Sequence, residues 1–183
     1  MSERTSAPKA PIIIIDLQTG MFDGVVEPPL HDAFALASRV RAVLEWARRT
    51  RRKVAFVRHD GPAGDPLAPG APGWPVWPAL GQSHDEPTFS KNVSNAFSNP
   101  AFAHWLAEQG GDEVVLLGAQ SEHCVAATVK GALDAGLRVT VISDAHSTWD
   151  WAGETAGEII ARQNAAFAEA GATLATTAEL TRS

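Results

Sequence analysis

Short apolar runs rich in β-branched residues alternate with longer segments of helical character along the chain. The first run, PIIIIDL, holds four consecutive isoleucines and shows no alternation of apolar and polar residues. A strand of this kind is typical of a parallel sheet covered by helices on both faces. The runs that predict strands span residues 11–17, 53–59, 113–119 and 137–145, with a short last one at 172–176. We therefore expect parallel βαβ units and a three-layer α/β/α sandwich with a mostly parallel, Rossmann-like sheet.

Three segments between these runs predict helices. They span residues 31–51, 123–136 and 152–171, and the last two end at Gly136 and Gly171, which are typical C-terminal caps. In the first, Phe34, Val40, Leu44 and Ala47 recur at helical spacing and are expected to face the core. We predict one domain over residues 11–183, preceded by a flexible N-terminus at residues 1–10.

Charge and cysteine content narrow the functional class. The 183 residues carry a formal net charge of −6, which argues against nucleic acid or an anionic membrane as the main partner. No apolar run is long enough to span a membrane, and residues 1–10 lack a signal-peptide core. A single cysteine excludes an internal disulfide and a thiolate metal cluster. These features favour a cytoplasmic protein, and the net charge gives no information about its substrate.

A long segment rich in proline and glycine, residues 60–87, interrupts the alternation of strands and helices. Loops of this length in a compact domain are usually functional or disordered. Trp74 and Trp77 argue against disorder, since disordered segments contain few aromatic residues. The segment is expected to be a pocket wall, a subunit contact or a surface loop held by its tryptophans.

Polar side chains stand where the predicted strands end. In open parallel sheets, ligands bind outside the carboxyl ends of the strands. Asp16 ends the first strand, Lys91 follows a short extended stretch, and Cys124 begins the helix after the strand 113–119. Asp16 is either a turn-capping residue or a buried general base. Cys124 is either a small buried apolar residue or a nucleophile whose pKa is lowered by the helix N-terminus.

Three stretches carry a resemblance to a known family. The segments IIIIDLQTGMF, SKNVSNAF and LLGAQSEHCVAATVKGALDAGLRVTVISDAHSTWD resemble the signature regions of the isochorismatase-like cysteine hydrolases. The resemblance covers residues 11–175 and implies a catalytic triad of Asp16, Lys91 and Cys124. It also implies a cis peptide bond between Ala119 and Gln120, and an oxyanion hole formed by the N–H groups of Gln120 and Cys124.

The resemblance implies hydrolysis of a carbon–nitrogen bond, such as an amide or carbamoyl group, through a thioester intermediate. Two alternatives stay open: vinyl-ether hydrolysis of the isochorismatase type, and a non-catalytic binding domain on the same fold. Vinyl-ether hydrolysis requires a general acid but no thiol, so Cys124 counts against it. Members of the family commonly form dimers or tetramers, so we expect a homo-oligomer.

Several residues are candidates for substrate binding. They are Gln18, Phe22, His59, Phe97 and Trp149, with Trp151 as a further aromatic wall. Two alternatives stay open: Phe97, Trp149 and Trp151 pack in the core or in a subunit interface, and Gln18 orients Asp16. We expect no metal and no other cofactor. Nicotinamidases of the family bind a metal through an Asp-x-His pair after the second strand. That order is absent here, and His59, Asp60 and His84 would need a different geometry to bind a metal.

Overall fold

A single parallel sheet organises the protein. The computed structural model describes residues 9–182, and its sheet has six strands in the order β3-β2-β1-β4-β5-β6. Every pair of neighbouring strands is parallel, and the order is that of the Rossmann fold, so the predicted fold class is confirmed. The strands are β1 (Ile12–Ile15), β2 (Val54–His59), β3 (Thr88–Lys91), β4 (Glu113–Ala119), β5 (Arg138–Ser147) and β6 (Thr173–Ala175).

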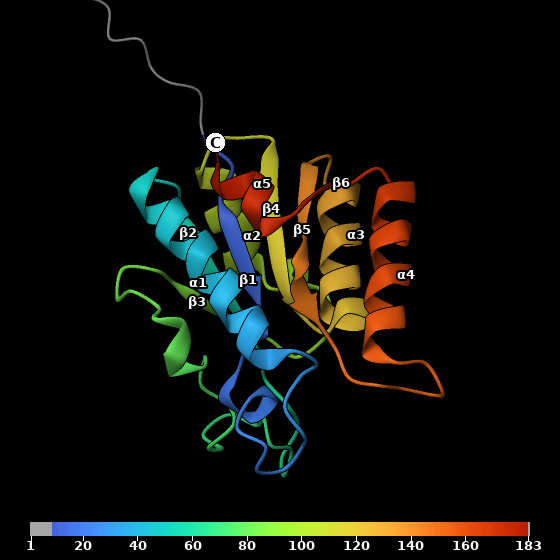
Figure 1. Ribbon diagram of the computed structural model, residues 1–183. Helices are drawn as coiled ribbons and strands as arrows, with labels where there is room; N and C mark the ends of the chain where they lie inside the picture. Colours follow the sequence, from blue (N-terminus) through green and yellow to red (C-terminus); the bar gives the residue numbers. More distant parts are fainter. Residues whose placement is uncertain (1–8, 183) are drawn as a thin grey trace, which may run out of the picture.

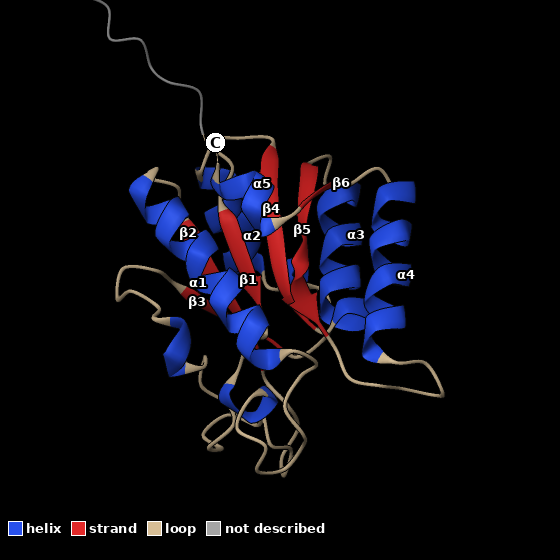
Figure 2. Ribbon diagram, in the orientation of Figure 1, coloured by secondary structure: helices blue, strands red, loops and turns tan. Residues whose placement is uncertain are grey.

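Helices cover both faces of the sheet, as Figures 1 and 2 show. Helices α1 and α5 pack on one face, and α2, α3 and α4 pack on the other. Their bounds are α1 (Ala33–Arg49), α2 (Pro100–Glu108), α3 (Ala126–Asp134), α4 (Ala156–Glu169) and α5 (Thr177–Thr181). Short 3₁₀ turns span Thr19–Met21, Pro78–Leu80 and Ala96–Ser98, and a π-helical turn spans Ser121–Val125.

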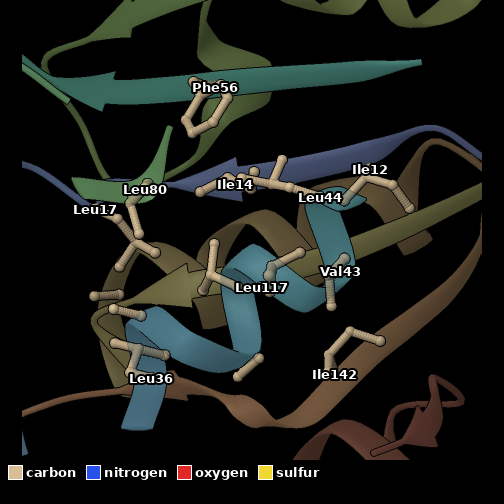
Figure 3. Packing of buried hydrophobic residues seen from close by; sticks show 14 of the residues in the cluster. Ile12, Ile14, Leu17, Leu36, Val43, Leu44, Phe56, Leu80, Leu117 and Ile142 are labelled. Atoms are coloured by element: carbon tan, nitrogen blue, oxygen red, sulfur yellow. The ribbon is translucent and has the colours of Figure 1, made fainter. Parts of the chain in front are cut away.

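The four isoleucines of β1 belong to the hydrophobic cores on both faces of the sheet. Because successive side chains of a strand point to opposite faces, Ile12 and Ile14 pack under α1, whereas Ile13 and Ile15 pack under α2 and α3. All four are fully buried, and burying one such side chain contributes about 1.5–3 kcal/mol. Figure 3 shows the α1 side, where Ile12 and Ile14 meet the helix. The central strand thus anchors both layers of helices.

The structure corrects several predicted elements. Phe34 is 87 % exposed, because its helical position points away from the face that Val40, Leu44 and Ala47 bury. Helices α2 and α5 were not predicted, although Asn99 caps α2 through its side chain and Pro100 begins it. The predicted helix 123–136 is a π-helical turn followed by α3.

Some sequence predictions fall outside what the structure tests. Residues 1–8 of the predicted flexible N-terminus lie outside the described residues. Within residues 9–182, no helix combines the length and the apolar character needed to cross a membrane. The cytoplasmic location and the homo-oligomeric state stay predictions.

Long loops gather at the carboxyl ends of the strands, at the bottom of Figure 1. The loop after β2 is fixed there by its tryptophans. Trp74 donates from Nε1 to Asp60 at 2.8 Å, and Trp77 stacks on Phe22 with ring centroids 4.1 Å apart. Gln18, which is fully buried, binds both sides of the His59 backbone: its Oε1 accepts from His59 N, and its Nε2 donates to His59 O. Residues 60–77 are therefore held against the carboxyl ends of the strands.

Candidate active site

Asp16, Lys91 and Cys124 meet at the carboxyl ends of β1, β3 and β4. Lys91 Nζ lies 2.6 Å from Asp16 Oδ2 and 3.2 Å from Cys124 Sγ, so one ammonium group bridges the carboxylate and the thiol. The side chains of Lys91 and Asp16 are 0 % and 1 % exposed. A buried ion pair is costly to desolvate, which makes a purely stabilising role for this pair a poor explanation. The structure therefore brings together the three residues that the sequence analysis selected.

The nucleophile candidate is presented by a turn with unusual backbone geometry. Gly118 has a φ of +135°, and the peptide bond between Ala119 and Gln120 is cis, at the predicted position. The carbonyl oxygen of Gln120 then accepts from the N–H groups of His123 and Val125, which closes the π-helical turn that contains Cys124. Such π turns are frequent at functional sites.

Burial sets the protonation of the acid and the thiol. It raises the pKa of Asp16, against the opposing effect of the Lys91 charge. Burial together with the negative charge of Asp16 raises the pKa of Cys124 to about 12, although Lys91 lowers it. The prediction of a lowered pKa at Cys124 is therefore wrong, because burial and the Asp16 charge raise it. One proton is shared between two acids that face a single ammonium group.

One oxygen of Asp16 is left for proton transfer. Oδ2 is bound to Lys91, Oδ1 is buried without another donor among the described residues, and the Cys124 thiol lies within hydrogen-bonding reach of the carboxylate. A thiol proton that passes from Cys124 to Asp16 leaves the net charge of the three side chains at zero. The arrangement therefore favours a general base that acts during attack over a thiolate that exists beforehand.

A cavity of about 500 Å³ opens beside these side chains. Asp16, Cys124 and Gln120 line its floor, and His59 and Trp149 form part of its walls. The long loop contributes Asp65, Pro66 and Leu67, so among the predicted roles for that loop the pocket wall is confirmed. The volume is within the usual range for small-molecule sites.

Three of the six residues predicted to contact the substrate lie in the cavity wall. His59, Trp149 and Trp151 line the cavity, whereas the remaining three candidates lie elsewhere. The side-chain amide of Gln18 is hydrogen-bonded to the His59 backbone and to the carbonyl of Trp74, and Phe22 stacks on Trp77. Phe97 packs edge-on against Phe102 in the core at 5.3 Å between centroids, because the 3₁₀ turn at Ala96–Ser98 directs it inward.

The donor set fits a metal poorly. Asp16, His59 and Cys124 place one ligand atom each within 4.8 Å of one another. However, the Lys91 ammonium group already binds the carboxylate and the thiol, and it would repel a cation held by the same atoms. The pKa of about 12 at Cys124 also opposes the thiolate form that metals require.

A second buried network supports the turn from behind, and sequence reasoning missed it. Asn164 Nδ2 donates to the Ser143 carbonyl, so Asn164 Oδ1 accepts from Nε2 of His146 at 3.0 Å. A neutral His146 then accepts at Nδ1, which makes Ser121 Oγ the donor at 2.8 Å. The chain Ser121–His146–Asn164 thereby ties the first residue of the π turn to β5 and α4.

This network predicts an acid-sensitive contribution to stability. Burial lowers the pKa of His146 below its ordinary value, so the native protein resists a proton that the unfolded chain accepts. The contribution is present above about pH 6.5 and is lost as the pH falls below it, with a slope approaching about 1.4 kcal/mol per pH unit. Urea unfolding between pH 7.5 and 5 should show a shallower slope in His146→Gln than in the wild type. The exposed His104→Gln is the control, and equal slopes in all three proteins would contradict the prediction.

Comparisons with known proteins identify the family of the chain. A family model described as the isochorismatase domain matches residues 10–179. The chain is 32 % identical over 139 residues to a streptothricin hydrolase from Streptomyces noursei, an alignment that covers 76 % of this chain and 50 % of that protein. A second streptothricin hydrolase from this organism is 31 % identical, with 78 % and 56 % covered. The chain spans about half the length of these curated relatives.

Two solved structures share the fold over nearly the whole chain. A putative isochorismatase hydrolase from Oleispira antarctica superposes with a TM-score of 0.90 at 26 % identity, covering 98 % of this chain and 99 % of that one. An isochorismatase from Pseudomonas putida superposes with a TM-score of 0.85 at 31 % identity, covering 92 % and 88 %.

Proposed function

Because the chain belongs to the isochorismatase family of hydrolases, we propose that it cleaves a carbon–nitrogen bond of a small molecule through a thioester on Cys124. The observation that carries the proposal is the position of Lys91, whose ammonium group contacts both Asp16 and Cys124 in a buried site open to a cavity. A nucleophile, a base and a charge that holds them together are what acyl transfer to a thiol requires.

In the first half of the proposed reaction, Asp16 takes the thiol proton as Cys124 Sγ attacks the carbonyl carbon. The N–H groups of Gln120 and Cys124 receive the negative charge that develops on the carbonyl oxygen, and each donor of this kind lowers the barrier by about 3–4 kcal/mol. Asp16 then returns the proton to the leaving nitrogen. The C–N bond breaks, ammonia or an amine departs, and the acyl group stays on sulfur as a thioester.

In the second half, water replaces the amine. Asp16 is again a carboxylate, and it takes a proton from the water that attacks the thioester carbon. The C–S bond breaks, the acid product leaves, and the proton on Asp16 returns to the thiol. Lys91 keeps its charge throughout and balances whichever of the two acids is ionised.

Two observations favour carbon–nitrogen cleavage over the vinyl-ether reaction. A thiol nucleophile in contact with a base has no role in a reaction that only needs an acid. The streptothricin hydrolases to which the chain is similar also support hydrolysis of an amide. The activity of those longer proteins extends to this chain only as part of the proposal.

The proposal is tested by ammonia release and by mass spectrometry on a panel of small amides, with isochorismate as the vinyl-ether comparison. We expect turnover of an amide and an acid-quenched adduct on Cys124 whose mass is that of the acyl group. Lys91→Met should lower turnover about a hundredfold, because Asp16 then loses the charge that holds it in place. The exposed Lys130→Met is the matched control.

The controls separate chemistry from folding. Lys91→Met must retain a cooperative thermal transition for its loss of turnover to be attributed to the chemistry and not to unfolding. Wild-type turnover in a folded Lys91→Met, or amide hydrolysis that leaves no acyl group on Cys124, would refute the mechanism. Exclusive turnover of isochorismate would replace the proposed function with the vinyl-ether one.

A further inference from the structure

We propose that the active-site cavity selects substrates that carry a positively charged group, and that Glu122 is the residue that binds this group. The inference rests on the proposed function only in taking this cavity as the substrate site. It goes beyond that function because it assigns a chemical class to the substrate and a binding residue that sequence reasoning did not select.

The charged side chains that line the cavity are mostly negative. Four of its lining residues are carboxylates: Asp16, Glu27, Asp65 and Glu122. No lysine or arginine is among the described residues that line it, and its basic side chains are the histidines His59 and His123. Asp16 is balanced by Lys91, so the other three carboxylates give the cavity its negative potential. A cleft lined by one sign of charge attracts ligands of the opposite sign.

Glu122 stands out among these carboxylates by its burial. Its side chain is 13 % exposed, and it lies on the same π-helical turn as Cys124, two residues earlier. Oε1 accepts a hydrogen bond from Thr148 Oγ1 at 2.7 Å, which fixes the carboxylate in the cavity wall. Oε2 is buried and has no hydrogen-bond partner among the described residues. A carboxylate that is buried without a full set of partners costs stability, and a bound cation offsets that cost.

Among the described residues, no basic group donates a hydrogen bond to Glu122 Oε2. His123 comes nearest with Nε2 at 3.8 Å from Oε1, and its side chain is 59 % exposed, while Arg162 attracts the carboxylate without contacting it. Arg162 is held by a two-pronged ion pair with Glu154. His146 is kept neutral by burial, which lowers its pKa. Because no protein cation among the described residues is hydrogen-bonded to Oε2, the Glu122 carboxylate leaves a negative charge in the cavity wall that attracts a cationic group of the ligand.

The apolar part of the cavity suits the same kind of ligand. Trp149 and Trp151 both line it, and the Trp149 ring is fixed by a hydrogen bond from Nε1 to the Pro28 carbonyl. Indole faces attract ammonium and guanidinium groups, and this attraction adds to that of a carboxylate. An ammonium group bound between Glu122 and a tryptophan would hold the rest of the substrate over Cys124.

The single thiol allows a test that does not depend on finding the natural substrate. Methanethiosulfonate reagents with an aminoethyl, a hydroxyethyl or a sulfonatoethyl group differ in charge but react with Cys124 in the same way: the thiol forms a mixed disulfide with the group, and methanesulfinate leaves. We expect the wild type to react at least tenfold faster with the cationic reagent than with the anionic one, after division by their rates with free N-acetylcysteine amide. Raising the salt concentration should reduce this ratio.

Glu122→Gln should lower the cation-to-anion ratio several-fold, because glutamine keeps an acceptor for Thr148 but removes the charge. Glu169→Gln, which removes an exposed charge at the end of α4, is the matched control and should keep the wild-type ratio. A wild-type ratio near one, or one that Glu122→Gln and Glu169→Gln change equally, would overturn the inference.

A substrate pair separates this inference from the proposed function. The amides 5-aminopentanamide and hexanamide differ at the end of the chain, where an ammonium group replaces a methyl group. We expect a higher kcat/KM for the cationic amide, and a ratio of the two kcat/KM values that falls in Glu122→Gln. Turnover of both amides without preference would overturn the inference and leave the function standing. Charge-selective labelling of Cys124 without turnover of any amide tested would support the inference and refute the proposed function.

Discussion

Asp16→Asn is expected to lower turnover about a thousandfold, since the asparagine can neither take the thiol proton nor return it to the leaving nitrogen. The same change should make Cys124 more reactive toward iodoacetamide. In the wild type, burial and the Asp16 charge raise the pKa of Cys124 to about 12. Without that charge, Lys91 faces the thiol alone and the thiol pKa falls, so the thiolate fraction at pH 8 increases. Activity and reactivity therefore change in opposite directions.

Two rates check this prediction. Ammonia release gives the turnover, and the second-order rate of alkylation at pH 8 gives the reactivity of the single cysteine. The alkylation rate of Asp16→Asn should exceed that of the wild type at least tenfold, whereas the exposed Asp134→Asn should match the wild type in both assays. If the alkylation rate fell together with turnover, Asp16 would be stabilising a thiolate at Cys124 in the free protein. The description of one proton shared between Asp16 and Cys124 would then be wrong.

Topology places the members of the triad at one edge of the sheet, and the resemblance to the family is what selected them from the other polar residues there. Asp16 and Lys91 end parallel strands and Cys124 follows another, so all three lie at one edge of the sheet wherever the loops run. The resemblance to the family then supplied their roles. The same reasoning could not predict the pKa of Cys124, since that depends on how deeply the thiol is buried and on the distance to Asp16.

The walls of the cavity were less predictable than its floor. Phe97 and Phe22 are aromatic residues near the site in sequence, but each packs against another aromatic ring instead of facing the substrate. Which way a side chain in a 3₁₀ turn points depends on the turn, and periodicity carries no information over three residues. Glu122 was missed because an acidic residue in the first turn of a helix is ordinary. Its meaning comes from the buried oxygen beside the cavity.

Gly118→Ala is expected to destabilise the protein by about 3–5 kcal/mol, from steric overlap and from an unfavourable φ together. A Cβ atom at this position would lie 2.1 Å from the carbonyl oxygen of Ile15 and 2.7 Å from its nitrogen. Ile15 pairs with Gly118 in the sheet, so the neighbour is rigid backbone that cannot turn aside. The φ of +135° is also one that residues with a Cβ atom rarely adopt.

Urea unfolding of Gly118→Ala and Gly157→Ala measures this effect against a matched glycine. Gly157 lies in α4 with open space around it, so alanine there should stabilise the protein by about 0.5–1 kcal/mol. Whatever fraction of Gly118→Ala folds should also lose turnover, because moving β4 away from β1 separates Cys124 from Asp16. An unfolding free energy equal to that of the wild type would mean that the two strands can part without cost. The close approach of β1 and β4 would then not be what sets the distance between the base and the nucleophile.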